Sequence, residues 1–377
     1  MAGKRSIFED AEQGAQSTPP KTGVISAGRD GHPRALRIWL MVLFALVVLM
    51  IAVGGLTRLT DSGLSITEWA PITGAIPPLN AVDWASAFEK YQQIPEYQLQ
   101  NQGMSLSEFK VIYWWEWGHR QLGRFIGLVW LVGFVGLLAT KSIPKGWTGR
   151  LLILGFLGGL QGAVGWWMVS SGLSGRMLDV ASYRLATHLG LAFVILGLIY
   201  AFIITLGRER AELFQAYRLR ETQLVTWANV LVVLVFLQIL LGALVAGIDA
   251  GRSFTTWPLM GEAFFPSTGW DLSPPWSNFF ENAGLVQFNH RISGYLLGIL
   301  VVVAFVRSRK STFKSVKDAF LWAKVALWLQ IIWGICTVLY AAPWQLAIVH
   351  QFLAVVVICL ILRARFLATY PVSERIA

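Results

Sequence analysis

The sequence contains little charge and almost no cysteine. Charged residues make up 14% of its 377 positions, whereas hydrophobic residues make up 55%. Soluble domains carry about 25% charged residues, so this composition excludes an ordinary soluble globular protein. The two cysteines, Cys336 and Cys359, both lie within apolar stretches, which excludes a disulfide in a polar outer loop.

The N-terminal segment lacks a long hydrophobic run. Residues 1–34 have no apolar core of the kind found in signal peptides, and Glu9, Asp10 and Glu12 argue against an organellar transit peptide. Their polar composition with Gly, Pro and Ser predicts a disordered cytoplasmic tail. We interpret His32 as a solvated residue of this tail, and we expect the protein in a bacterial inner membrane.

Long apolar runs are abundant after the tail. A helix needs roughly 20 apolar residues to cross a hydrocarbon core of about 30 Å, and eight stretches reach this length. The sequence therefore predicts an all-α integral membrane protein. The expected transmembrane helices are at about residues 36–56, 119–140, 150–170, 184–206, 224–247, 287–307, 318–340 and 344–364.

Positive charge collects in alternate segments between these helices. A net charge of +10 alone is compatible with nucleic-acid binding, but the intervening loops are neutral or acidic, which is typical of membrane topology instead. The positive-inside rule predicts both termini in the cytoplasm, with attraction to anionic lipid as a secondary effect. The basic residues of the three inner loops are Lys141, Lys145, Arg150, Arg208, Arg210, Arg218, Arg220, Arg309, Lys310, Lys314 and Lys317.

The chain contains an internal duplication. The stretch from Gly54 to Gly63 matches the stretch from Gly242 to Gly251, and the same offset pairs Trp69 with Trp257. Because each repeat has four helices, both repeats enter the membrane from the same side, which makes the repeat parallel. Later matches pair Leu160, Gln161 and Gly165 with Leu329, Gln330 and Gly334.

This duplication predicts two four-helix bundles related by a pseudo-twofold axis along the membrane normal. We expect the N-terminal half at residues 35–206 and the C-terminal half at 223–366. A cytoplasmic linker at 207–222 joins them, and residues 367–377 form a second cytoplasmic tail.

Four of the five histidines occupy matching places in the two halves. His119 and His290 each begin a His-Arg-x-x-Gly motif, and His188 and His350 lie in the fourth helix of their halves. A histidine inside a membrane is costly without a partner and marks a functional site. Two histidines from facing helices suit the axial positions of a haem, whereas zinc prefers three or four protein ligands. No Cys-x-x-Cys-His motif is present, so such a haem is held non-covalently.

Charged residues next to these histidines are further candidates. Arg120 and Arg291 directly follow His119 and His290, and Arg124 lies one helical turn after Arg120. Each arginine suits two compatible roles, which are anchoring the helix end at the membrane interface and pairing with a haem propionate.

Glu116 breaks the symmetry between the halves. It precedes His119 by three residues and shares a helix face with it, whereas the equivalent position holds Gln287, which cannot ionise. This difference predicts chemistry at the first site and electron storage at the second. The alternative is that Glu116 caps the N-terminus of the second membrane helix through the helix dipole.

The outer loops at residues 57–118 and 248–286 are long and rich in Trp, Pro and Gly. Loops of this length are commonly functional, and we expect both to lie on the membrane surface as lids. Most of their tryptophans suit an interfacial belt without a catalytic part.

At these motifs the chain resembles the haem A synthase family, in its proteobacterial and mitochondrial branch. The resemblance covers nearly everything after the tail, including the stretch from Gly54, the Glu116-x-x-His-Arg motif and the second-half histidines. It implies an oxidoreductase that converts the C8 methyl group of haem O to a formyl group by successive hydroxylations. The product, haem A, serves terminal oxidases.

The resemblance also implies how the site residues are divided. It implies a permanent, bis-histidine haem b in the second half, with His290 and His350 as its axial ligands. Arg291, which follows His290, is our candidate for a further residue that binds this haem. The resemblance also implies a substrate haem in the first half, bound by His119 and His188, and Glu116 matches the acidic residue implicated in catalysis. Arg120 and Arg124 are our candidates for binding the propionates of this haem. The resemblance further implies delivery of haem O by haem O synthase and an electron-transfer partner, and it is compatible with a homo-oligomer. The cysteine pair in an outer loop of some members is absent here.

Two other classes of protein share some of these features. A di-haem membrane cytochrome b would use the same histidine pairs for electron transfer alone, without needing Glu116. A duplicated transporter would explain the repeat, but such folds usually have broken helices and charges near the midplane, whereas the helix centres here are apolar.

Overall fold

The computed structural model describes residues 33–175 and 178–372, and these residues form helices but no β-strand. The expected tail up to His32 and the end of the second expected tail, residues 373–377, lie outside the described residues.

In the described part of the chain, eight helices are long and apolar enough to cross a membrane, as predicted. The shortest has 22 residues and is about 33 Å long, which is sufficient for a hydrocarbon core of ~30 Å. The chain is therefore a multi-pass membrane protein. The eight are α1 (Pro33–Leu59), α4 (Leu106–Ala139), α5 (Thr148–Val169), α6 (Ser182–Leu206), α8 (Thr222–Gly247), α10 (Ala283–Ser308), α11 (Lys314–Leu339) and α12 (Trp344–Thr369).

The placement of proline explains why these helices run without interruption. Proline inside a helix removes a backbone hydrogen bond and clashes with the preceding turn. Pro33 occupies the first position of α1, where its missing N–H does no harm, and Pro343 directly precedes α12. None of the 14 prolines in the sequence falls in the interior of these eight helices.

Helix α4 begins earlier than predicted. It begins at Leu106 rather than near residue 119, behind a capping box in which Ser105 and Glu108 each accept a hydrogen bond from the other's backbone N–H. Glu116 and His119 therefore lie about three turns inside the helix. The expectation that Glu116 caps this helix is wrong, because Ser105 and Glu108 do so.

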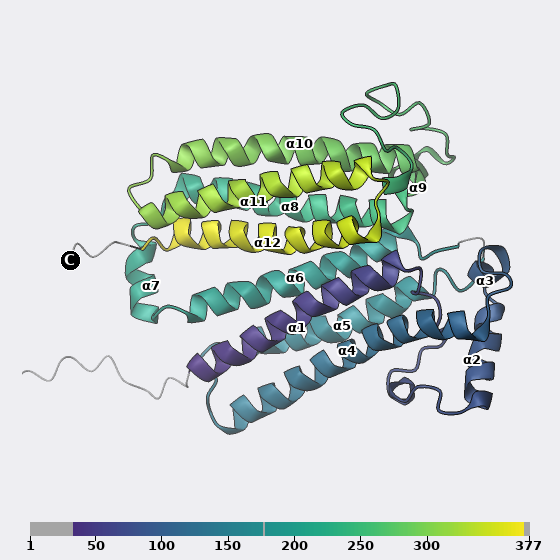
Figure 1. The fold of residues 1–377 in the computed structure, drawn as a ribbon. Helices are drawn as coiled ribbons and strands as arrows, with labels where there is room; N and C mark the ends of the chain where they lie inside the picture. The colour runs from purple at the N-terminus through teal and green to yellow at the C-terminus, as the bar shows by residue number, and fades with distance from the viewer. Residues whose placement is uncertain (1–32, 176–177, 373–377) are drawn as a thin grey trace, which may run out of the picture.

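The outer and inner connections contain shorter helices. The first outer segment contains η1 (Thr73–Ala75), α2 (Ala81–Gln92) and α3 (Pro95–Leu99), so less of it is loop than predicted. Figure 1 shows α2 and α3 at one end of the long helices and the linker helix α7 (Arg210–Tyr217) at the other. The second outer segment contains η2 (Ala250–Arg252), η3 (Pro275–Ser277) and α9 (Asn278–Glu281).

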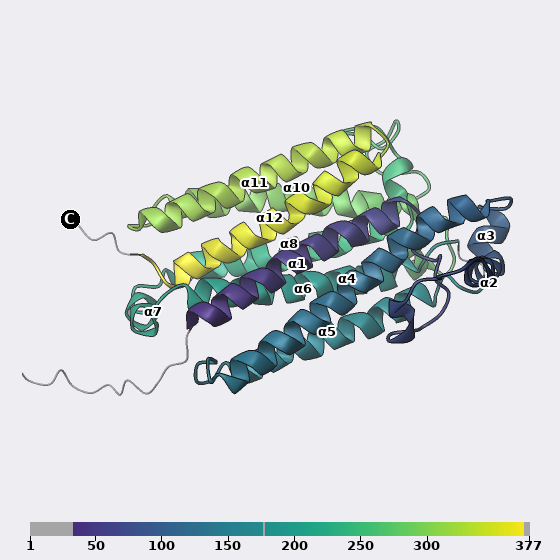
Figure 2. The same cartoon turned by 60° about the horizontal axis from the view of Figure 1, so that its bottom comes forward.

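The long helices form two groups of four. Figures 1 and 2 show α1, α4, α5 and α6 on one side and α8, α10, α11 and α12 on the other. In each group the first helix packs against the second and the fourth, and the third packs against the second and the fourth. The groups meet where α1 and α6 pack against α12 and α8. Each group is thus a ring of four helices with the same order of contacts, and the pseudo-twofold relation between the groups stays a prediction.

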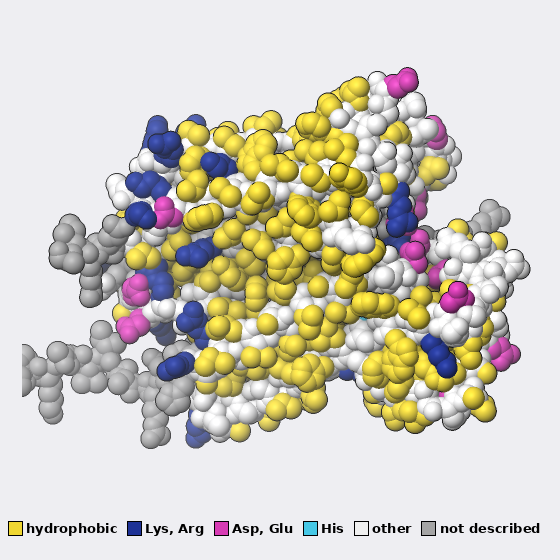
Figure 3. Space-filling view, viewed as in Figure 1, with side chains coloured by type: hydrophobic (Ala, Val, Ile, Leu, Met, Phe, Trp, Pro, Cys, Tyr) yellow, Lys and Arg dark blue, Asp and Glu magenta, His cyan; other side chains and the backbone are white. Residues whose placement is uncertain are grey.

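Charge is unevenly distributed along the long axis. Figure 3 shows an apolar band around the middle, with lysine and arginine gathered at the end where α7 lies. Apolar side chains exposed on this band, such as Phe156, Val233 and Ile299, suit contact with lipid. The end that carries α2, α3 and α9 is therefore the end opposite the basic one.

A buried carboxyl group lies in the outer segment. Glu96 on α3 is only 4% exposed, and its Oε1 accepts hydrogen bonds from the Tyr91 hydroxyl at 3.1 Å and from Asn101 Nδ2 at 3.3 Å. Burial raises the pKa of Glu96 to about 8, against the lowering effect of the Tyr91 hydrogen bond. Repulsion from Asp179, Asp61 and Glu116 adds to the rise.

This raised pKa predicts a pH dependence of the outer segment. Folding favours the protonated carboxyl, so the stability of the segment should fall as pH rises from about 4.5 to about 8 and then level off. Glu96→Gln should remove most of this slope. The measurement is hydrogen exchange of the α2 and α3 amides across that pH range, with the exposed Glu89→Gln as the control. Equal slopes in the two variants would contradict the assignment.

Candidate functional site

The structure places the four histidines in two pairs. His119 on α4 and His188 on α6 lie on diagonally opposed helices of the first group, and His290 on α10 and His350 on α12 do so in the second. The members of each predicted pair thus lie on opposed helices of one group, while their role as haem ligands stays a prediction.

The second pair is spaced for a metal ion between the rings. The ring centroids of His290 and His350 are 6.4 Å apart, with the planes at 77°. A bond from a metal to an imidazole nitrogen is about 2 Å long, so imidazoles on opposite sides of one ion have centres roughly 6 Å apart. Among residues 33–175 and 178–372, no group of three or more His, Cys, Asp or Glu side chains could hold a metal ion. A metal between these rings would therefore have the two imidazoles as its side-chain ligands from this set.

Each imidazole packs on a glycine of the preceding long helix. A Cβ added to Gly334 would lie 2.8 Å from His350 Cε1, closer than real Cβ contacts, so only glycine leaves room for the ring there. The same arrangement occurs four times, and we call these residues the shelf glycines. The pairs are Gly54–His119, Gly165–His188, Gly242–His290 and Gly334–His350.

Three of the histidines also contact a glutamine one turn before the shelf glycine. The Gln330 amide donates to the backbone carbonyl of His350 at 3.0 Å and lies 3.3 Å from its Nε2. Gln161 and Gln238 donate to the carbonyls of His188 and His290, both at 2.9 Å. These amides restrain both the turn that carries the imidazole and the ring itself.

Several hydrogen-bonding atoms around the second pair are buried without a partner. They include His350 Nδ1, Gln330 Oε1 and the Nε of Arg291. Buried polar atoms are nearly always satisfied, and a histidine that binds a metal through one nitrogen usually donates from the other to an acceptor. With one ring nitrogen of His350 bound to a metal, the other would carry a hydrogen, and the carbonyl oxygen of Gln330 is an acceptor of the matching kind. The site therefore fits a group with a metal at its centre and acidic groups at its edge.

The carboxylate of Glu116 is buried and fully hydrogen-bonded. Its Oε2 accepts from the Ser65 hydroxyl and the Ile66 backbone N–H, both at 2.7 Å. Its Oε1 accepts from Arg120 Nε at 3.0 Å and Nη2 at 2.6 Å. With 2% of the residue exposed, Glu116 ties the first outer loop to α4 one turn before His119.

The predicted arginines Arg120 and Arg291 each hold the outer loop of their own half. Arg120 donates to the carbonyls of Ile66 and Glu68. At the same offset in the second half, Arg291 donates to the carbonyls of Phe254 and Thr256 at 2.8 and 2.9 Å. In both halves the arginine after the first histidine therefore binds backbone carbonyls of the outer loop, a contact that the sequence could not reveal.

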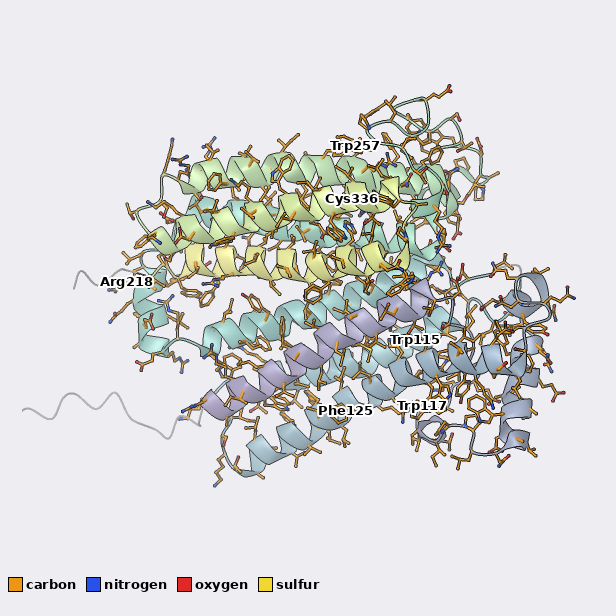
Figure 4. All side chains as sticks on the ribbon, in the orientation of Figure 1. Trp115, Trp117, Phe125, Arg218, Trp257 and Cys336 are labelled. Carbon is orange, nitrogen blue, oxygen red and sulfur yellow. The ribbon has the colours of Figure 1, made fainter. Side chains whose placement is uncertain are left out.

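Neighbouring side chains of the loops differ more between the halves. Arg124 donates to the carbonyls of Ala70 and Pro71, whereas its counterpart Tyr295 accepts a hydrogen bond from Trp257 at 2.8 Å. Figure 4 shows Trp257 in the second outer segment and Trp115 and Trp117 on α4, all toward the outer end and away from Arg218. The side chain of Gln287 donates to Phe254, while its Oε1 has no partner.

One ion-pair cluster was missed from the sequence. Arg58 at the end of α1 pairs with Asp61 at 2.8 Å, Asp249 at 2.9 Å and Asp179 at 3.3 Å. Burial raises the pKa of Asp179, while Arg58 opposes that rise. Asp61 and Asp249 are duplicates in the repeat, and both adopt a positive φ. The match between Asp61 and Asp249 was readable in the sequence, but their shared partner, Arg58, was not.

Comparisons with known proteins give matches over most of the chain. The model of the cytochrome oxidase assembly protein family matches residues 37–362. A protein of Dinoroseobacter shibae named heme A synthase is 65% identical over 375 residues, which are 99% of this chain and 98% of that protein. Proteins of the same name from Ruegeria pomeroyi and Cereibacter sphaeroides are 59% and 56% identical, over 100% and 98% of this chain and 100% and 96% of their own lengths.

The shelf glycines predict a steric test of the second pair. Gly334→Ala should weaken haem binding there by about tenfold or more, because the new methyl group would lie 2.8 Å from His350 Cε1. Haem content and the absorbance spectrum of the purified protein measure the effect. Gly136→Ala, where a Cβ meets open space, is the control. A full, unchanged haem spectrum in Gly334→Ala would show that the ring position is not restrictive.

Proposed function

The chain belongs to the haem A synthase family of cytochrome oxidase assembly proteins, and from this membership we propose that its halves divide the oxidation of haem O between them. The family reaction converts haem O to haem A, so the chain is an oxidoreductase with haem O as its substrate. We assign the substrate to the N-terminal half, residues 35–206, and a resident haem b to the C-terminal half, residues 223–366.

The facing imidazoles of His290 and His350 are the single observation that best supports the haem b assignment. A haem bound there supplies reversible electron transfer at a potential set by its ligands and surroundings. The protein's part is to hold both rings, through Gly242 and Gly334 and through the amides of the two glutamines. We propose that Arg291, whose buried Nε has no partner, also meets a haem propionate.

We propose that His119 and His188 hold the substrate haem, with Arg120 and Arg124 at its polar edge. Both arginines already bind loop carbonyls, so the same guanidinium groups would connect the outer loop to the propionates. The loop then acts as a lid whose position depends on occupancy of the site.

Glu116 is the residue we propose as catalytic. Oxidation of a methyl group to a formyl group releases protons, and a positioned carboxylate accepts them. The second half has Gln287 at this place, which cannot accept a proton and lies where only electron transfer is needed. Ser65, the Ile66 N–H and Arg120 fix the direction of the carboxylate.

A di-haem cytochrome b without turnover is not favoured. The family match covers most of the chain, and an electron carrier gives no reason for a buried carboxylate beside only one of two equivalent histidines.

The charge distribution supports a sidedness proposal. Because lysine and arginine gather at the α7 end, we propose that this end and both termini face the cytoplasm. The haem sites then lie toward the periplasmic side, with the residue 207–222 linker and the 367–377 tail inside. We further propose that haem O synthase delivers the substrate and that a separate electron-transfer partner, or another copy of the chain, docks on this protein.

Removal of a second-half histidine tests the haem b assignment. Replacing His290 or His350 with Ala should remove most of the haem b and its low-spin, bis-histidine spectrum, because one axial bond is lost. Extraction and chromatography of the haems, together with absorbance spectra, measure this. Unchanged haem b in both variants would place the resident haem elsewhere.

A substitution at Glu116 separates catalysis from loop anchoring. Glu116→Gln keeps the size of the side chain and should retain haem b and haem O, while haem A formation falls by about 10²–10⁴-fold. Chromatography of haems from cells that co-express haem O synthase measures it. Ser65→Ala removes one hydrogen bond to the carboxylate but keeps the charge, and it should lower product far less. Loss of haem O binding in both variants would mean that Glu116 only anchors the loop.

A further inference from the structure

The support of the four histidines is not equal. His188, His290 and His350 each have a glutamine one turn before the shelf glycine, at positions 161, 238 and 330. The corresponding position before Gly54 is Met50 on α1. Within the described residues, His119 has no hydrogen bond from a side chain of this kind.

Met50 occupies the same place in the fold as Gln238. A Cβ added to Gly123, four residues after His119, would lie 3.6 Å from Met50 Cε. A Cβ added to Gly294, four residues after His290, would lie 3.3 Å from Gln238 Nε2. The two side chains therefore fill equivalent gaps between the first and second helices of their halves, and only the glutamine carries a donor.

The shelf under His119 is also the loosest and differs in ring orientation. A Cβ on Gly54 would lie 3.3 Å from the ring, whereas the other three distances are 2.8 to 3.0 Å. The atom nearest Gly54 is Nε2, while at the other three shelves it is Cε1. Packing and hydrogen bonding thus agree that His119 is the least restrained of the four imidazoles.

We propose that Met50 makes His119 the exchangeable axial ligand of the substrate haem, an inference that rests on the proposed haem sites. Partners outside the first coordination shell fix the orientation of a ligating imidazole, and their loss typically weakens the metal site 10–100-fold. In the second half both ligands have such a partner, which suits a resident haem. In the first half only His188 has one, which suits a haem that enters as substrate and leaves as product.

The consequence for the first site is selective access. A small ligand added from solution competes with the weaker imidazole, so the iron of the substrate haem accepts it on the His119 side. The doubly supported haem b does not. The amides of Gln161, Gln238 and Gln330 position their histidines. Met50 has no donor and so leaves His119 without this support.

Cyanide binding to the ferric protein tests this proposal. The protein is purified from cells that co-express haem O synthase, its two haems are quantified, and cyanide is titrated by absorbance. In the unaltered chain only the first-half haem should bind cyanide. Met50→Gln should weaken this binding by about 10–100-fold, because the new amide reaches the carbonyl and ring of His119. Met50→Leu, which also lacks a donor, is the matched control and should bind cyanide like the unaltered chain.

The reciprocal variant guards against a folding defect in Met50→Gln. Gln238→Met should make the second-half haem bind cyanide about 10–100-fold more tightly. If Met50→Gln and Met50→Leu bind cyanide equally and Gln238→Met gains nothing, the proposal is overturned. The haem assignments are judged separately, since they fail if His119→Ala and His290→Ala keep full haem content. If those two variants lose haem but Met50→Gln leaves the cyanide affinity unchanged, the proposal about Met50 is rejected and the haem assignments stand.

Discussion

The close approach of two helices at a glycine is the contact on which both sites depend. An imidazole in a membrane bundle finds no water and must meet its needs within the protein. The shelf glycine lets the ring lie on bare backbone, and the glutamine one turn earlier supplies a donor to the turn that carries it. Moving either helix by a fraction of an ångström would close the space or break the amide contact. The long helices, which have no proline in their interiors, keep that spacing constant.

The two halves share one frame and differ in single residues beside their paired histidines. Both halves have the ring of four helices, the paired histidines and an arginine that holds loop carbonyls. They differ at Glu116 and Gln287, and at Met50 and Gln238. A resident cofactor needs firm ligation and no proton acceptor, whereas a site of turnover needs the reverse. The proposed division of tasks depends on these two differences.

Length and apolarity alone revealed the eight helices, since a membrane span leaves a run that few other structures require. The histidines were equally visible, because polar residues in such runs are rare. The start of α4 was not, because residues 106–118 mix aromatic and charged side chains and continue the helix beyond the apolar run. The loop contacts of Arg120 and Arg291 left no trace either, since their partners are backbone carbonyls.

The shelf glycines and Met50 acquire meaning only when the neighbouring helix is known. Glycine is common in this chain, with 36 residues, and nothing in the sequence marks those that face an imidazole. A glutamine four residues before a glycine in three of the helices was a readable regularity. Without the contact to a histidine, it had no chemical interpretation.

The Arg58 cluster has a consequence for how the duplicated halves relate. Arg58 neutralises carboxylates of both halves, and its own counterpart in the repeat is Ala246, whose carbonyl accepts a hydrogen bond from Arg58. Two copies of the second half would lack Arg58 and would leave Asp249 with Arg252 alone, at 3.9 Å. Arg58 therefore links the two halves through contacts for which the second half has no arginine of its own.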